Sequence, residues 1–441
     1  MTKGLKNIQI TFSEDHITHY GGLHLLNSFC KKLNLKWFLQ NYVKVGANHR
    51  EYQTAEFLLL LIYATILGVK RIENIQYMQT NGVTKKIIGI DHIPDNSTIR
   101  RFLYSLKPDE IRQIVKVHNL IQKQIFLKLH SKTSITLDID GTVLTVFGKQ
   151  QRSKVGFNPK RKGARSYMAM LCFESDKEFW HGNLYSGSVS QVKVAKHMIR
   201  RCLAKLPYPI YRIRVRLDAG FFSYDFIDNF LEKENIGYSI EAQMNKPLQS
   251  YLREVRYQPY KQGWEVAEFS YQPSHSKQIH RFVVQRRPLP EDPDEKLQLR
   301  LFEMKNYGYR VLVTNLNLRP DSAWDFHSQR AQGAELNIKE LKTNYGMAKI
   351  PSKYFLANVA YLQIILLAFN LMNWFKWLCL PEEHRHDSLQ TIREQLLSVA
   401  ARLTKTGNRN YLNFPSSYQY QGLFRFALDR VNKMKKLKFT V

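Results

Sequence analysis

The feature that most constrains the fold is an alternating strand pattern, followed by further strands and helices in a regular order. In the stretch ITLDID, which ends at Asp140, the Ile and Leu side chains point to one face, and Thr136, Asp138 and Asp140 point to the other. Two more extended segments follow, and then a helix, a strand, a helix and a strand, over 166–175, 181–190, 192–206, 211–221, 223–236 and 237–243. This order predicts an α/β fold with a mixed sheet flanked by helices.

The other segments divide the chain around this sheet. Residues 1–130 have apolar positions at helical spacing and predict an all-helical N-terminal region. Residues 251–308 contain strand-like segments punctuated by Pro and Gly, which we interpret as a β-rich insertion whose last strand returns to the sheet. The sheet domain would then comprise 131–250 and 309–380, followed by a basic helical region over 381–441.

One segment of the N-terminal region is a candidate recognition helix. The sequence IPDNSTIRRFLYSL predicts a helix that starts after an N-cap at Asp95, Asn96 or Ser97. With Arg100 and Arg101 in its first turn, it resembles the recognition element of a helix-turn-helix. An ordinary capped surface helix fits the same residues equally well.

The apolar segments predict a soluble, cytoplasmic protein. Residues 355–380 are long enough to cross a membrane, but polar side chains interrupt them at Asn358, Gln363, Asn370, Asn373 and Lys376. We therefore expect a core helix. The N-terminus lacks the apolar core of a signal peptide, and the four cysteines lie in apolar contexts typical of buried thiols in a reducing compartment.

Charge indicates the kind of partner. Lys and Arg outnumber Asp and Glu by 66 to 37, a formal net charge of +29, while an apolar fraction of 44% is ample for a folded core. A large folded chain with this much positive charge usually meets a polyanion. Because the charge is spread along the whole chain, we expect nucleic acid as the partner.

The sequence Asp138-Ile-Asp140-Gly-Thr fits two kinds of phosphate chemistry. It resembles the nucleophile motif of haloacid-dehalogenase phosphatases, and it also fits the first carboxylate of a metal-dependent nuclease. The phosphatase interpretation needs a following helix and a later acidic pair for magnesium. Here more strand follows, then a basic loop over 149–165 without acidic residues, and Asp292 and Asp294 lie in a Pro-rich loop. These features favour the nuclease.

A two-metal nuclease needs carboxylates that converge from separate elements. Asp140 lies on the first strand, Asp218 ends a later strand before the turn AGF, and Glu335 opens a helix. Glu335 and Lys342 are seven residues apart and share one helix face, with Lys339 between them. A carboxylate stacked with lysines suits a metal whose substrate is a phosphate backbone.

From Tyr20 to about Lys376 the chain resembles the DDE transposases of bacterial insertion sequences, in the group with a β-rich insertion before the catalytic Glu. The segments that carry the resemblance include YGGLHLL, IPDNSTIRRF, LDIDGT, GFNPKRKGARSYMAML, VRLDAGF and QRAQGAELNIKELK. The chain departs from the family at one point. The family usually places a Tyr and an Arg before the Glu, with three residues between Arg and Glu; here Arg330 has four, and the aromatic residue is Phe326.

The resemblance implies a ribonuclease H-like fold in which Asp140, Asp218 and Glu335 hold Mg²⁺, for which Mn²⁺ can substitute. It implies a bacterial, nucleoid-associated enzyme that binds terminal inverted repeats through its N-terminal region. Such an enzyme cleaves double-stranded DNA and joins the ends to target DNA, as a homodimer on DNA. The residues expected to contact DNA are Lys160, Arg161, Lys162, Arg165, Trp264, Arg330, Lys339 and Lys342.

Three other functions remain open from the sequence. A captured or inactive transposase would bind DNA ends without cutting them, and a plain nuclease would cut without joining. The phosphatase would use Asp138 to form a phosphoenzyme and would not need Glu335.

Overall fold

The computed structural model describes residues 10, 12, 16–46, 52–78, 82–129, 132–206, 208, 210–261, 263–274, 276–289 and 307–437. The chain divides into two compact units. Unit 1 comprises residues 1–118, 344–351 and 363–441, and unit 2 comprises 119–343 and 352–362. The candidate carboxylates all belong to unit 2.

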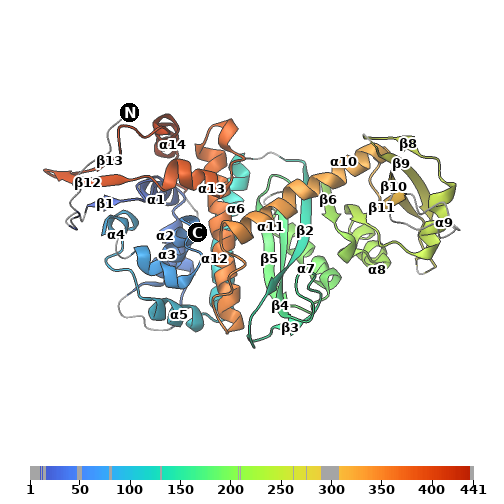
Figure 1. Ribbon diagram of the computed structural model, residues 1–441, viewed down its shortest axis with the longest axis horizontal. Helices are drawn as coiled ribbons and strands as arrows, with labels where there is room; N and C mark the ends of the chain where they lie inside the picture. Colours follow the sequence, from blue (N-terminus) through green and yellow to red (C-terminus); the bar gives the residue numbers. More distant parts are fainter. Residues whose placement is uncertain are drawn as a thin grey trace. The chain divides into compact units, whose positions relative to one another are not determined.

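Unit 2 contains a ten-stranded mixed sheet, drawn in green to orange in Figure 1. Its order is β3-β4-β2-β6-β7-β11-β10-β9-β8, and β5 pairs with β4. The strands β2, β6 and β7 are parallel and all other pairs are antiparallel. Their bounds are β2 (Ser134–Thr145), β3 (Lys154–Val155), β4 (Arg165–Glu174), β5 (Phe179–Ser186), β6 (Arg212–Leu217) and β7 (Gly237–Glu241).

The alternation predicted for β2 is confirmed. Ile135, Leu137 and Ile139 belong to the main apolar core. That core also takes in side chains from the helices that follow, which are α7 (Gln191–Leu203), α8 (Tyr224–Phe226), the π-helical turn η3 (Ile227–Glu232) and α9 (Lys246–Glu254). The opposite face of the strand carries Asp138 and Asp140, because successive side chains alternate.

A second helix series crosses this opposite face. It runs from α10 (Pro320–Arg330) through the π-helical turn η5 (Ala331–Glu335) into α11 (Leu336–Thr343), and Figure 1 shows it as one long orange rod over the sheet. The first part covers β9 and β10, where Trp324 joins a small apolar cluster, and η5 reaches β2 and β4. Through this crossing, η5 contacts β2, the strand that carries Asp138 and Asp140.

The predicted insertion is built onto the same sheet. Strand β11 (Tyr307–Thr314) pairs antiparallel with β7, as expected for the strand that returns to the sheet. Beyond it lie β10 (His280–Pro288), β9 (Glu265–Tyr271) and β8 (Gln258–Pro259), and these strands extend the sheet at that edge. The first part of the segment differs from the strand pattern we expected: α9 is helical, with Asn245 capping its first turn through Leu248 N and Pro247 in that turn.

Unit 1 is mainly helical. Its helices are α1 (Leu23–Lys32), α2 (Leu35–Tyr42), α3 (Thr54–Ile66), η1 (Ile72–Met78), α4 (Gly82–Ile88), α5 (Asn96–Ser105), η6 (Glu382–His384), α13 (Leu389–Ile392), the π-helical turn η7 (Arg393–Leu397) and α14 (Gln421–Lys433). The candidate recognition helix forms as α5, and its N-cap is Asp95, whose side chain accepts a hydrogen bond from Thr98 N. Arg100 pairs with Glu73.

The expectation of wholly helical ends is wrong in two places. In the region 381–441, which we expected to be helical, the helix that begins at Leu389 ends at Leu397, and a hairpin of β12 (Ala401–Thr406) and β13 (Arg409–Asn413) follows. Gly407 in its turn has a positive φ of 58°, which favours a tight turn over helix. A short N-terminal strand, β1 (Ile17–Thr18), pairs with β12 and completes a three-stranded sheet.

Two long helices, α6 (Pro108–Leu129) and α12 (Phe355–Cys379), contribute residues to both units. Helix α12 is long and apolar enough to cross a membrane, but 94% of its most apolar window is buried inside the protein. Its polar residues have partners within the protein: Asn370 bonds His118 at 2.8 Å, and Asn358 bonds the backbone of Ser352 in both directions. The helix thus has the burial and polar pairing of a core helix, as the sequence predicted.

The start of α1 gives a test of packing in unit 1. A Cβ at Gly22 would stand 1.7 Å from the Leu396 carbonyl oxygen and 2.6 Å from the Leu397 Cα. Because both atoms are backbone, Gly22→Ala should lower the free energy of unfolding by roughly 1–3 kcal/mol or more, measured by urea denaturation. The matched control is Gly422→Ala in α14, where a Cβ meets nothing within 4 Å, and which should be neutral or slightly stabilising. Equal effects of the two changes would contradict the packing.

Candidate active site

The parallel register of β2 and β6 places two aspartates side by side. Asp138 pairs in register with Arg216, so Asp140 and Asp218 each lie two residues further along neighbouring strands. Asp218 follows the last residue of β6 and caps the 3-10 turn η2 (Ala219–Phe221), where its Oδ1 accepts a hydrogen bond from Gly220 N at 2.9 Å. Glu335 ends the turn η5, which packs on β2.

The pKa of Asp140 shows that the three carboxylates share one electrostatic environment. This pKa is raised to about 7, first by burial and then by the charge of Asp218, with a smaller contribution from Glu335, while Arg330 and the Gly141 N–H act in the opposite direction. The pKa of Asp218 is also raised, first by burial, with Arg330 opposing. The structure therefore brings Asp140, Asp218 and Glu335 together, as the sequence expectation required.

Arg330 lies in the middle of this group. Its Nη2 donates to Glu335 Oε1 at 2.7 Å, and its Nη1 is 3.7 Å from Asp140 Oδ2. The unusual spacing of four residues between Arg330 and Glu335 has a structural explanation. Between them the helix widens into the π-helical turn η5, in which residues five apart lie one turn apart, so the two side chains meet on one face.

Asp138 has a different environment from Asp140. Its two oxygens accept hydrogen bonds from Arg216 Nε and Nη2 at 2.6 and 2.8 Å, and the side chains of Asp138 and Arg216 are 0% and 2% exposed. Arg216 also donates to the Phe326 carbonyl and to Gln329 Oε1 on α10. Asp138 thus joins the sheet to the crossing helix and is not open to a substrate.

Gly333 explains how close that helix can approach. A Cβ at this position would stand 2.4 Å from Asp138 Oδ2. A glycine in η5 therefore lets the helix backbone rest on the buried carboxylate, and this contact sets the position of Glu335 two residues later.

The donor set at this site fits a hard divalent cation. Mg²⁺ and Mn²⁺ prefer carboxylate oxygens, and a cation bound here would remove the repulsion by which Asp218 and Glu335 raise the pKa of Asp140. Among the described residues no three Asp, Glu, His or Cys side chains are already arranged around a metal position. Arg330 pairs with Glu335, and its Nη1 lies 3.7 Å from Asp140 Oδ2.

Two of the expected phosphate contacts lie close to the carboxylates. Burial lowers the pKa of Lys342, the charge of Lys160 lowers it further, and Asp140 acts in the opposite direction. Lys342, at the end of α11, and Lys160, from the loop after β3, therefore face the same region. Lys339, Arg161 and Lys162 are exposed, with Arg161 stacked on the exposed Phe147 ring.

Two other expected DNA contacts have partners elsewhere. Arg165 holds its own loop by donating to Ser153 Oγ and to the Ser153 carbonyl. Trp264 lies in the turn before β9, a strand that is four positions from β6 in the sheet, and the Arg287 guanidinium lies over its ring. The structure does not bring Trp264 to the three carboxylates.

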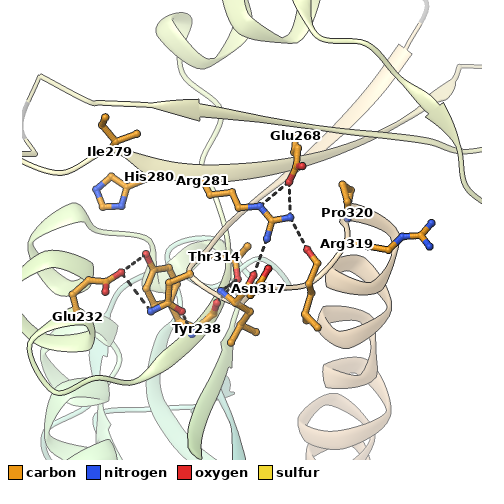
Figure 2. Close-up of a pocket in the computed structure, with 13 residues that line it drawn as sticks. Glu232, Tyr238, Glu268, Ile279, His280, Arg281, Thr314, Asn317, Arg319 and Pro320 are labelled. Carbon is orange, nitrogen blue, oxygen red and sulfur yellow. Dashed lines mark hydrogen bonds and ion pairs between the residues drawn. The ribbon is translucent and has the colours of Figure 1, made fainter.

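A separate pocket lies at the edge of the sheet where β7 begins and β11 ends, and it has a volume of about 570 Å³ (Figure 2). Its wall holds Arg281, which pairs with Glu268 and donates to the carbonyls of Leu316 and Leu318. Tyr238 donates to Glu232 on the other side. The pocket contains none of the three carboxylates, and its central arginine is already satisfied.

Sequence reasoning missed Arg216, Gly333 and Gln191. Arg216 carried a usable signal, because Arg-x-Asp on β6 repeats the spacing of Asp-x-Asp on β2, and a parallel register pairs them. Gly333 and Gln191 carried none, since their importance depends on the approach of η5 and α7 to the two aspartate strands.

Comparisons with known proteins bear on this geometry. A family model described as "Transposase DDE domain group 1" matches residues 2–436. Among solved structures, the chain is similar to a cryo-EM structure of piggyBac transposase in a synaptic complex with hairpin DNA, at 10% identity and a TM-score of 0.47. That alignment covers 97% of this chain and 89% of the other. No curated protein matches the chain.

The buried ion pair predicts a large loss of stability for Asp138→Ala. The change leaves Arg216 charged and buried, so the free energy of unfolding should fall by roughly 3–5 kcal/mol in urea denaturation. Asp225→Ala is the matched control, since it breaks an exposed pair with Lys196 and should leave the free energy of unfolding nearly unchanged. If Asp138→Ala unfolds like the control, the ion pair does not hold the helix on the sheet.

The raised pKa of Asp140 predicts a pH-dependent stability difference. In the metal-free protein the carboxyl ionises near pH 7, against 3.8 as its usual value, so the unfolded chain ionises first and the wild type loses stability as pH rises between these values. The free energy of unfolding of Asp140→Asn, minus that of the wild type, should grow by roughly 1–4 kcal/mol from pH 4 to 7 and then level off. Urea denaturation in EDTA measures this difference, and a value constant with pH would contradict the burial of the charge.

Proposed function

Because the chain belongs to the group 1 family of DDE transposase domains, we propose that it is a divalent-metal-dependent DNA transposase with a ribonuclease H-like catalytic unit. It binds the terminal inverted repeats of its own element, cuts the DNA at their ends and joins those ends to target DNA. The family membership and the grouping of the carboxylates are independent of each other and support the same chemistry.

The observation that carries this proposal is the convergence of Asp140, Asp218 and Glu335 on one region of unit 2. Three elements that are far apart in the sequence carry these carboxylates, and the pKa of Asp140 is raised to about 7 by burial and by the charges of Asp218 and Glu335. Keeping such a group costs folding free energy unless a cation binds there. Divalent ions at this site would activate the attacking oxygen and stabilise the leaving oxygen of a phosphodiester.

The chain's own residues have separable roles in this proposal. Asp140, Asp218 and Glu335 provide the oxygen ligands, and Arg330 orients Glu335 from within the same helix series. Lys160 and Lys342, which share the region beside Asp140, bind the phosphates that flank the scissile bond. The net charge of +29 provides the attraction for the rest of the duplex.

The phosphatase alternative finds no support at Asp138. That mechanism needs an accessible carboxylate to attack phosphorus, and Asp138 is fully buried and bonded through both oxygens to Arg216. Its environment is that of a structural ion pair.

The proposed function is tested with purified protein and a labelled duplex that carries the element's terminal repeat and flanking DNA. With Mg²⁺ or Mn²⁺, the wild type should cut at the repeat boundary, and Asp140→Asn and Glu335→Gln should each lower the rate by roughly three orders of magnitude. Asp225→Asn, an exposed carboxylate, is the matched control and should cut normally.

Binding is measured on the same duplex at several salt concentrations. The logarithm of the affinity should fall with the logarithm of salt, at a slope of about −0.9 for each phosphate neutralised, in wild type and variants alike. Binding without cutting by the wild type would indicate a captured DNA-binding protein, cutting without joining would indicate a plain nuclease, and a flat salt response would rule out the DNA partner.

A further inference from the structure

Gln191 lies against both aspartate turns of the candidate site. It is the first residue of α7, and its amide packs on Gly141, which follows Asp140, and on Gly220, two residues after Asp218. A Cβ at Gly220 would stand 2.5 Å from Gln191 Oε1 and 3.1 Å from Asp218 Oδ1, and one at Gly141 would stand 3.6 Å from Gln191 Nε2. Gly220 thus leaves the space that the amide oxygen fills, and Gly141 lies within contact distance of the amide nitrogen.

The amide oxygen of Gln191 is buried and has no hydrogen-bond donor within the described part of the chain. A buried acceptor without a partner costs roughly the desolvation of that group, so native structures keep few of them without a reason. The apolar alternatives at this position, Leu or Met, would fill the same space without the cost. The oxygen therefore indicates a partner that binds at this place.

The neighbours of Gln191 Oε1 identify the chemistry of that partner. A Cβ at Gly220 would lie close to both Gln191 Oε1 and Asp218 Oδ1. Gly141, which follows Asp140, lies beside the amide nitrogen. Oxygen acceptors gathered in this way attract a cation, and amide carbonyls join carboxylates in sites for hard divalent ions. A neutral ligand also adds no charge to a group whose carboxylates already repel one another.

We propose that Gln191 Oε1 is a further oxygen ligand of the divalent cation that Asp140 and Asp218 hold. The proposal rests on the proposed function only in taking that cation to be Mg²⁺ or Mn²⁺. It assigns α7 a part in the site that its sequence pattern, an amphipathic core helix, does not show. It also explains the glycine at position 220, where a Cβ would stand 2.5 Å from the amide oxygen and displace it.

The test is titration of the DNA-free full chain with Mn²⁺ alone. Binding is measured by isothermal titration calorimetry at pH 8 and by the electron paramagnetic resonance signal of free Mn²⁺. Gln191→Met keeps the volume and removes the oxygen, and should weaken binding roughly tenfold. Gln191→Glu restores an oxygen with a charge, and should bind at least as tightly as the wild type. Gln249→Met, on the exposed surface of α9, is the matched control and should bind like the wild type. Thermal denaturation without metal establishes that each variant is folded.

Two results would overturn the proposal. Wild-type affinity in folded Gln191→Met means that the oxygen is not a ligand. Weaker binding by Gln191→Glu than by wild type means that the amide instead donates its N–H to a carboxylate. Cleavage of the terminal-repeat duplex is scored separately: loss of Mn²⁺ affinity in Gln191→Met supports this ligand even if the wild type fails to cut DNA, and an active wild type with an unaffected Gln191→Met rejects only the ligand.

Discussion

The ion pair between Asp138 and Arg216 is the contact on which the geometry of the site depends. It joins two parallel strands two residues before each candidate aspartate, and Arg216 continues the network to α10 through the Phe326 carbonyl and Gln329. Both side chains are buried, so water cannot replace either partner. One buried network therefore fixes both the register of β2 and β6 and the position of α10 on the sheet. This network lies two residues from the candidate aspartates.

Above that network, the site is held in balance by opposite charges. Burial raises the pKa of Asp140 and of Asp218, the charge of Glu335 acts in the same direction on both, and Arg330 opposes these shifts while it pairs with Glu335. The guanidinium makes the folded, metal-free site tolerable, because it offsets part of the repulsion. Glu335 is half exposed, unlike Asp140, so of the two it has more freedom to exchange the guanidinium for another cation.

Much of this arrangement could be predicted from local patterns. Alternation in ITLDID fixed the face of Asp140, and the Glu335-to-Lys342 spacing correctly indicated that both lie on one helix series. Asp138 and Asp140 share one face of β2, and the structure separates their roles through Arg216, whose register opposite Asp138 only the sheet reveals. The C-terminal hairpin was mistaken for helix because Val399 and Leu403 continue the apolar spacing of Leu396 beyond Leu397, where the helix ends. Gln191 gave no signal, since a glutamine at a helix start is ordinary until its neighbours are known.

The π-helical turn η5 has a consequence for how chains of this kind can vary in length. An extra residue inside an α-helix rotates everything beyond it by about 100°, which would turn Glu335 and Lys342 away from the aspartates. A single widened turn absorbs the extra residue locally, and the helix on either side keeps its facing. The distance between arginine and glutamate along the chain is therefore free to change by one while their meeting in space is preserved. A search that demands a fixed interval between them would pass over such a chain, although its chemistry is in place.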